Sequence, residues 1–204
     1  MTSLTKISPP NASDTVPRER AFRLLDDCMR SPAVWIASPA GSGKTTLVSS
    51  YLQARKIPCL WYQIDSGDSD TATFFYYLGL AAKKAAPRFR KALPLLTPEY
   101  SMGIPVFARR YFEELYKRLK PPFAIVLDNY QEIPADSPLH EIVNIGLSCV
   151  PEGIRVVVIS RYVAPGNFAR LRANNEMKLF GWDEIRLTRE ETGEIAQASY
   201  GQRL

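Results

Sequence analysis

The stretch AVWIASPAGSGKTTLVSSYLQAR, residues 33–55, predicts a buried strand, a glycine-bearing turn and a helix in direct succession. The apolar run 33–38 is typical of a buried strand, and apolar side chains recur at helical spacing over 44–55. The turn carries two glycines, a lysine and two threonines. Backbone N–H groups of such a turn, next to a helix N-terminus, converge on a phosphate group. The stretch therefore predicts a phosphate-binding loop.

Each residue of the turn has an expected role toward a nucleotide. Gly41 and Gly43 let the backbone come close where a Cβ would collide. Lys44 can bridge the β- and γ-phosphates, Thr45 can offer its hydroxyl to Mg²⁺, and Thr46 supplies a second hydroxyl toward the α-phosphate. The residues predicted to bind nucleotide here are Pro39, Ala40, Gly41, Ser42, Gly43, Lys44, Thr45 and Thr46.

Ser38 stands where the common pattern G-x-x-x-x-G-K-[ST] opens with glycine. Glycine at that position eases the turn but does not itself bind phosphate, and Gly41 and Gly43 keep the positions nearest the nucleotide. A Gly/Ser-rich turn that resembles a phosphate loop by chance is the alternative. The strand, the helix and the Lys-Thr-Thr run all favour a working loop.

A second motif, FAIVLD, places Asp128 at the end of an apolar strand, the arrangement called Walker B. Its carboxylate can hold a Mg²⁺-bound water opposite Thr45. Many P-loop ATPases follow this Asp with an acid that polarises the attacking water, but Asn129 follows here. An amide can orient water but cannot take its proton. Glu132 is the nearby substitute, with a solvated loop acid as the alternative, so we expect slow hydrolysis or none.

The strand RVVVISR, residues 155–161, delivers Arg161 to the sheet edge where ligands bind in open α/β folds. An arginine there can contact the γ-phosphate and distinguish ATP from ADP. A surface ion pair is the alternative role for Arg161.

Apolar strands that alternate with helices predict an α/β fold, a P-loop NTPase with a mostly parallel sheet and helices on both faces. Residues 1–15, rich in Ser, Thr, Pro and Asn, predict a flexible lead-in. Residues 16–182 are expected to form the nucleotide-binding domain, with a proline-rich excursion at 87–105. In 183–204, Thr188 and Glu191 have capping-box spacing, which predicts the first helix of a truncated helical domain.

The composition indicates an ordinary soluble globular protein of 204 residues, with 46% hydrophobic and 23% charged residues. The net charge of +5 is mild, and the short basic clusters RFRK (88–91) and KRLK (117–120) read most simply as solvated faces. Three dispersed cysteines and a single histidine argue against disulfides and a zinc site. With no apolar signal core and no long apolar run, we expect a cytoplasmic protein without a membrane partner.

The motifs also occur in a recognisable order, VPRER (16–20), WIASPAGSGKTTL (35–47), LWYQID (60–65), IVLDNY (125–130), VVVISR (156–161) and LTREE (187–191). Over about residues 15–195 this series resembles the nucleotide-binding core of signal-transduction ATPases with numerous domains (the STAND class). The likeness is to the branch that includes the maltose-regulon activator and the large LuxR-type bacterial transcription regulators. In that branch the loop reads SPAG-x-GKTT, so Ser38 conforms.

The resemblance implies an ATP/ADP switch, in which ADP holds a closed monomer and ATP with an inducer gives an open oligomer. It implies that Arg18 or Arg20 lies near the base or ribose and that Arg161 lies near the γ-phosphate. Asn129 departs from the family, which usually has a second Asp there. DNA binding and inducer binding would belong to domains absent from this chain.

Three functions fit these motifs. The first is a nucleotide-gated regulatory switch. The second is a catalytically active P-loop enzyme, either an AAA+-type ATPase or a small-molecule kinase, and rapid turnover would favour it. The third is a non-hydrolysing interaction module, against which the intact Lys44, Thr45 and Asp128 count.

Overall fold

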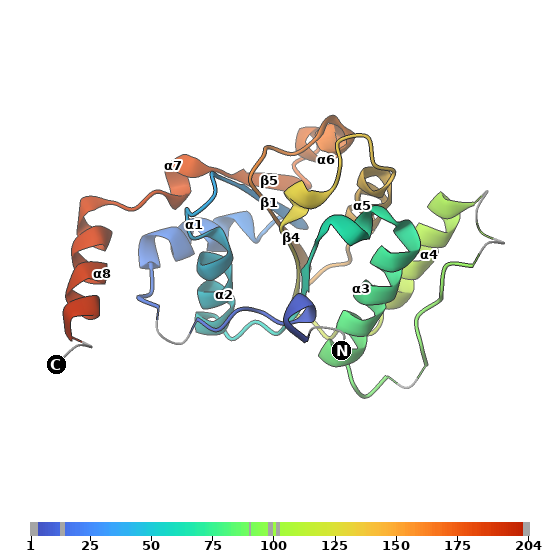
Figure 1. Cartoon of the computed structure of the whole chain (residues 1–204), viewed down its shortest axis with the longest axis horizontal. Coiled ribbons are helices and arrows are strands. Elements are labelled where there is room, and N and C mark those ends of the chain that lie inside the picture. Colours follow the sequence, from blue (N-terminus) through green and yellow to red (C-terminus); the bar gives the residue numbers. More distant parts are fainter. Residues whose placement is uncertain (1–3, 13–14, 90, 98–99, 101–102, 202–204) are drawn as a thin grey trace.

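A single five-stranded sheet forms the centre of the computed structural model, which describes residues 4–12, 15–89, 91–97, 100 and 103–201 (Figure 1). The strands are β1 (Ala33–Ala37), β2 (Cys59–Gln63), β3 (Phe123–Asp128), β4 (Ile154–Ser160) and β5 (Met177–Phe180). They lie in the order β2-β3-β4-β1-β5, and every neighbouring pair is parallel. The predicted α/β fold is confirmed.

Helices cover both faces of this sheet. The α-helices are α1 (Glu19–Cys28), α2 (Lys44–Ala54), α3 (Thr71–Ala85), α4 (Ile104–Tyr116), α5 (Leu139–Leu147), α6 (Ala169–Ala173), α7 (Trp182–Ile185) and α8 (Arg189–Gly201). Short 3-10 helices are η1 (Leu4–Ile7), η2 (Ser66–Ser69), η4 (Tyr130–Glu132) and η5 (Gly166–Phe168). In Figure 1, α1 and α2 lie on one side of the strands, and α3, α4 and α5 lie on the other.

The strands are apolar on both faces because each face packs against helices. Successive side chains of a strand point to opposite faces, so Val34 joins a core cluster with α1 and α2, whereas Trp35 joins one with α3, α4 and α5. All six residues of β3 are buried. Burial of each large apolar side chain contributes about 1.5–3 kcal/mol, so these two clusters are the main source of stability. Among the described residues, no helix is long and apolar enough to cross a membrane.

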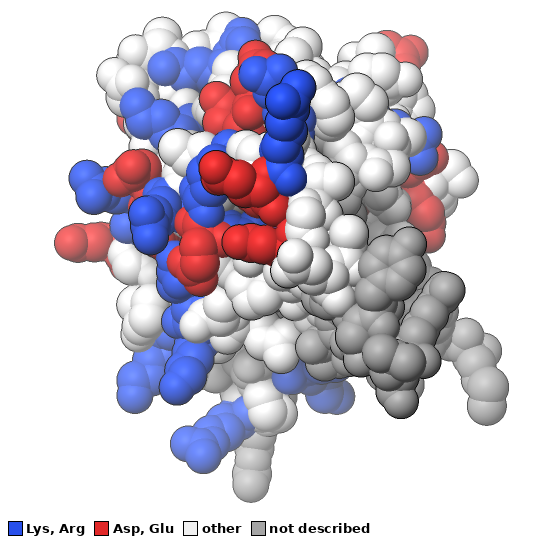
Figure 2. All heavy atoms as spheres, turned by 90° about the vertical axis from the view of Figure 1, so that its left-hand side faces the viewer, with Lys and Arg blue, Asp and Glu red and all other residues white. Residues whose placement is uncertain are grey.

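Acidic and basic side chains are intermixed on the side of the molecule that carries α8 (Figure 2). Ion pairs of the residues in and beside α1 include Arg55 with Asp26 at 2.9 Å and Arg18 with Glu191 at 3.2 Å. The mild positive charge of the chain therefore does not gather into one continuous basic surface on this side.

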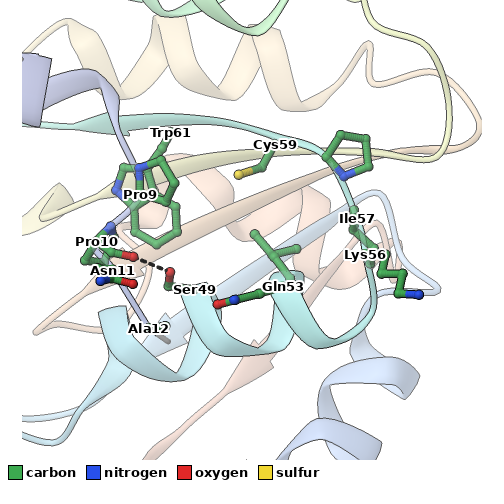
Figure 3. Close-up of a pocket in the computed structure, with 12 residues that line it drawn as sticks. Pro9, Pro10, Asn11, Ala12, Ser49, Gln53, Lys56, Ile57, Cys59 and Trp61 are labelled. Atoms are coloured by element: carbon green, nitrogen blue, oxygen red, sulfur yellow. Dashed lines mark hydrogen bonds between the residues drawn. The ribbon is translucent and has the colours of Figure 1, made fainter. Parts of the chain in front are cut away.

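The N-terminal segment 4–12 packs on the domain, whereas its composition predicts a flexible lead-in. Lys6 in η1 forms ion pairs with Asp65 at 2.6 Å and with the fully buried Asp68 at 2.9 Å. Farther along, Ser49 of α2 donates a hydrogen bond to the Pro10 carbonyl at 2.7 Å (Figure 3). These contacts join the segment to residues far away in sequence, which its composition does not signal, and its flexibility stays a prediction.

Candidate functional site

The predicted motifs meet at the carboxyl edge of the sheet. β4 lies between β3 and β1, with Ala37 paired with Ser160 and Leu127 paired with Val158. The loops that follow these three strands therefore lie side by side. This is the edge at which ligands bind in open parallel sheets.

The loop between β1 and α2 has the backbone conformation that a phosphate cradle needs. Gly41 and Gly43 have φ of +75° and +78°, a region that side chains with a Cβ rarely adopt. Among the described residues, no atom lies within 4 Å of the place where a Cβ would stand at either position. Gly43 is also the N-cap of α2 and offers no side-chain hydrogen bond, so the first N–H groups of α2 point at the loop without a cap. The loop therefore suits an anion.

Ser38 has a defined structural role in place of the glycine of the common pattern. Its side-chain oxygen shares a short hydrogen bond with the Ser42 hydroxyl across the loop, and its carbonyl accepts from Lys44. Gly41 and Gly43 have positive φ, whereas Ser38 is not among the described residues with positive φ. The turn thus needs no glycine at residue 38, and the Ser38 hydroxyl connects the start of the loop to Ser42 by a hydrogen bond.

Lys44 is buried under the loop with its ammonium group facing the cradle. Its Nζ donates to the carbonyls of Ser38 at 2.6 Å and Pro39 at 2.8 Å. Burial lowers the pKa of Lys44, the positive charge of Arg161 lowers it further, and Asp128 opposes both. The positive charge of Arg161 thus acts on Lys44, and the contact of Arg161 with a γ-phosphate stays a prediction.

The hydroxyl of Thr45 donates to the Oδ1 atom of Asp128 at 3.1 Å, so the two residues predicted to hold Mg²⁺ lie next to each other, and their metal binding stays a prediction. Burial raises the pKa of Asp128 above its usual value, although hydrogen bonds from Thr45 and the Asn129 N–H oppose this. Among the described residues, no group of three or more His, Cys, Asp or Glu gathers as a metal site. One hydroxyl and one carboxylate still fit Mg²⁺, which commonly takes one or two carboxylates, substrate phosphates and waters.

Asn129 lies at the turn after β3 in the left-handed region, with φ of +60°. Asn adopts this conformation more readily than most residues, which gives a local reason for its presence. Its backbone N–H donates to Asp128 at 2.9 Å, while its side-chain oxygen accepts from Gln131 at 3.4 Å. Asn129 therefore helps to orient Asp128 through the backbone, and its own side chain is an amide that cannot take a proton from water.

Gln131 connects two loops of the site, and the sequence did not single it out. Its amide nitrogen donates to Asn129 at 3.4 Å and to Glu132 at 3.3 Å, and its side-chain oxygen accepts from the Arg161 N–H at 3.2 Å. Arg161 is exposed at the end of β4, and its loop is fastened by a hydrogen bond from Trp35 to the Tyr162 carbonyl at 2.9 Å. No sequence motif marks a Gln that bridges two strands' loops.

The remaining loop residues predicted to bind nucleotide lie at the surface or near it. Pro39, Ala40 and Thr46 are exposed, and Ser42 is half-buried. The structure places them in the same loop and first helical turn as Lys44 and Thr45, where the loop faces solvent.

Arg18 and Arg20 contact the C-terminal part of the chain. Arg18 donates to the Ile185 carbonyl at 2.6 Å, and Arg20 donates to the Arg186 carbonyl at 2.8 Å. Both guanidinium groups also pair with Glu191, at 3.2 and 3.3 Å. The two arginines thus hold the segment between α7 and α8, and their contact with a base or ribose stays a prediction.

The start of α8 has the predicted capping box. The Thr188 N–H donates to the Glu191 carboxylate at 2.9 Å, and the Glu191 N–H donates to the Thr188 hydroxyl at 3.2 Å. The same carboxylate therefore serves the helix start and both arginines.

Comparison with known proteins supports the fold. No protein-family model matches this chain. The ORC1 protein of Aeropyrum pernix, solved in complex with DNA, is similar over 95% of this chain and 52% of its own, with 15% identity and a TM-score of 0.52. This chain thus spans about half the length of that protein.

Two further solved structures are more distant. Drosophila ORC bound to GC-rich DNA and Cdc6 has a TM-score of 0.44 and 11% identity, over 88% of this chain and 30% of its own. PCH-2 of C. elegans has a TM-score of 0.40 and 13% identity, over 80% of this chain and 41% of its own. With the ORC1 likeness, the sheet order and the loop after β1, the chain has a P-loop NTPase fold.

Proposed function

We propose that this chain is an ATP/ADP-binding regulatory switch domain of the STAND type, the N-terminal part of a bacterial transcription regulator, with slow or absent hydrolysis. One observation carries the proposal. The Thr45–Asp128 pair is assembled at the mouth of an open glycine loop, and the position that usually polarises water is occupied by Asn129. These features support nucleotide binding, and Asn129 offers no proton acceptor for the attacking water.

The residues of the loop divide the work of binding. The N–H groups of the turn and of the α2 N-terminus would bind phosphate oxygens. The Lys44 ammonium would exchange its contacts with the Ser38 and Pro39 carbonyls for contacts with phosphate oxygens. Thr45 and Asp128 would hold Mg²⁺, which supplies charge neutralisation to the β- and γ-phosphates when it is bound.

The switch would depend on how the site distinguishes ATP from ADP. Arg161 acts electrostatically on Lys44, and its backbone is joined through Gln131 to the loop after β3. A γ-phosphate between these groups would bind both cations, whereas ADP would leave Arg161 without that contact. A nearly complete swing between two states takes about 5.5 kcal/mol of differential affinity. ATP-dependent self-association would follow from that difference, and DNA would be bound by domains outside this chain.

A catalytically active P-loop ATPase is the alternative, and Gln131 favours it. A glutamine can orient the attacking water in some nucleotide hydrolases. In this chain the Gln131 amide is already hydrogen-bonded to Asn129, Glu132 and the Arg161 N–H, so water would have to compete with these contacts.

Steady-state ATP hydrolysis and sedimentation of the chain test the proposal together. We expect turnover far below about 1 s⁻¹, the lower end of ordinary enzymes, and a larger species with MgATP than with MgADP. Asn129→Asp should raise the turnover because it restores a carboxylate at a backbone conformation that Asp tolerates. Turnover of the wild type at ordinary enzymatic rates, or identical sedimentation with both nucleotides, would contradict the switch.

A further inference from the structure

Two basic segments that are far apart in sequence meet at the amino edge of the sheet, opposite the P-loop. Helices α2 and α3 run antiparallel to the strands and end at this edge, where Pro58 precedes β2 and Phe123 begins β3 (Figure 1). A cavity of about 590 Å³ lies there. Its charged lining consists of Lys56, Arg88, Arg118 and Lys120.

These four cations have no acidic counterpart in the cavity. Asp and Glu are missing from the described residues that line it, and none of the four is in an ion pair with a described residue. The nearby Glu114 pairs instead with Lys117 at 2.8 Å. Four cations without an ion pair around one cavity create a positive potential that attracts an anion, and one guanidinium nitrogen of Arg118 already donates to the Ala92 carbonyl at 3.0 Å.

Lys56 has a left-handed backbone conformation, in which a lysine is unusual. It follows the C-cap of α2 with φ of +53°, and the hydrogen bonds Lys56 N–H to Gln53 and Ile57 N–H to Leu52 close the helix there. Glycine is the usual residue at this position, because a Cβ is sterically disfavoured in the left-handed region. Lys56 lines both the pocket drawn in Figure 3 and the basic cavity. What the lysine adds over glycine is an ammonium group at the rim of the basic cavity.

The other walls of the cavity are apolar and partly aromatic. Phe89 is 47% exposed, and the Arg118 guanidinium lies over its ring at 5.9 Å. Phe123 and the prolines at 121 and 122 complete the floor. The volume lies within the range of about 300–1,000 Å³ that is typical of small-molecule sites.

We propose that this cavity binds a small phosphate ester that carries an apolar ring. Two arginines can bind one phosphate through paired N–H donors, and the lysines supply further charge. A phosphate monoester has a charge of about −1.5 to −2, which suits several cations better than a single carboxylate does. The ring of the ester lies against Phe89, which is the exposed aromatic side chain of the cavity lining. The site is separate from the P-loop, because the two lie at opposite edges of the sheet.

Calorimetric titration of the chain with phenyl phosphate, inorganic phosphate and benzoate tests this site. We expect saturable binding of phenyl phosphate that is tighter than binding of either other probe. The double variant Arg88→Ala/Arg118→Ala should weaken phenyl phosphate binding by about tenfold or more, since both bidentate donors are lost. The matched control Arg109→Ala/Arg110→Ala removes the same charge from exposed positions of α4 and should leave the affinity within about twofold.

A second variant keeps the test independent of folding. Lys56→Gly relieves the left-handed strain, so the melting temperature should not fall, while phenyl phosphate affinity should fall about threefold or more. Equal affinity of the wild type and the Arg88/Arg118 variant would overturn the proposal. So would absence of saturable binding, or inorganic phosphate binding as tightly as phenyl phosphate.

Discussion

Replacing Glu191 by alanine should release α8 from the rest of the domain. The Glu191 side chain is 9% exposed and accepts from Arg18, whose side chain is 11% exposed, and from Arg20. Removing one partner of a buried ion pair usually costs about 3–5 kcal/mol. Arg18 keeps its hydrogen bond to the Ile185 carbonyl at 2.6 Å, so we expect the lower end, about 3 kcal/mol. That loss raises the population of the detached helix by about 100-fold.

Native-state amide hydrogen exchange of the segment 187–197 measures this release. Glu191→Ala should speed the exchange of α8 by about 100-fold, and Glu191→Gln by about tenfold, since glutamine keeps the capping box but loses the charge. Glu194→Ala changes an exposed residue of the same helix and should shift its stability by less than about 0.5 kcal/mol. Equal exchange in Glu191→Ala and Glu194→Ala would refute the reasoning.

The same contact has a defined pH dependence. Burial raises the pKa of Glu191, but the hydrogen bonds from Arg18, the Thr188 N–H and Arg20 outweigh it, so the net pKa lies below its usual value. A carboxyl group with a lowered pKa in the folded state stabilises above its unfolded pKa, and this contribution is lost as the pH falls through the folded pKa. Protection of α8 should therefore fall in acid in the wild type, whereas Glu191→Gln should not show that fall.

Three further substitutions, with Gly193→Ala as the control for one of them, test the site and the core. Asp128→Asn should remove the Mg²⁺-dependent part of nucleotide affinity, about tenfold. It should not lower thermal stability, because burial already disfavours the charged form of Asp128 and raises its pKa. Unchanged affinity with and without Mg²⁺ would count against the metal role. Gly43→Ala should lower the free energy of unfolding by about 1–2 kcal/mol because φ is +78°. Gly193→Ala inside α8 should instead raise helix stability by about 0.5–1 kcal/mol. A change of the same sign in the unfolding free energy of both variants, measured with denaturant, would contradict this. Gly146→Ala places a Cβ 2.7 Å from the Phe112 ring and should cost about 1–3 kcal/mol, and an unchanged melting temperature would show that α4 and α5 move apart freely.

The sequence predicted the fold and the meeting of the main motifs because both depend on local patterns. Buried strands were visible as apolar runs, and parallel strands necessarily bring their carboxyl ends to one edge. The positions of Lys44, Asp128 and Arg161 after three neighbouring strands therefore follow from the sequence pattern. Their roles toward nucleotide depend on a ligand and remain proposals.

Contacts between distant segments were not predictable from the same patterns. Arg18 pairs with Glu191, 173 residues away, and its contact with a base or ribose stays a prediction of the resemblance. The N-terminal segment has a composition typical of disorder, yet Lys6 reaches the buried Asp68. Gln131 joins two loops through its side-chain amide, and Lys56 adopts a conformation that its sequence neighbours do not signal. These contacts and conformations depend on how distant elements pack, so the spacing of residues in the sequence does not predict them.

The proposed switch depends on binding of ATP and ADP with Mg²⁺ by the loop after β1. Calorimetric titration of the wild type and of Lys44→Ala with each nucleotide measures this binding. We expect one nucleotide per chain for the wild type and an affinity lower by about 100-fold or more in Lys44→Ala, since a charged donor to the phosphates is lost. Absence of binding to the wild type, or equal binding to Lys44→Ala, would contradict it.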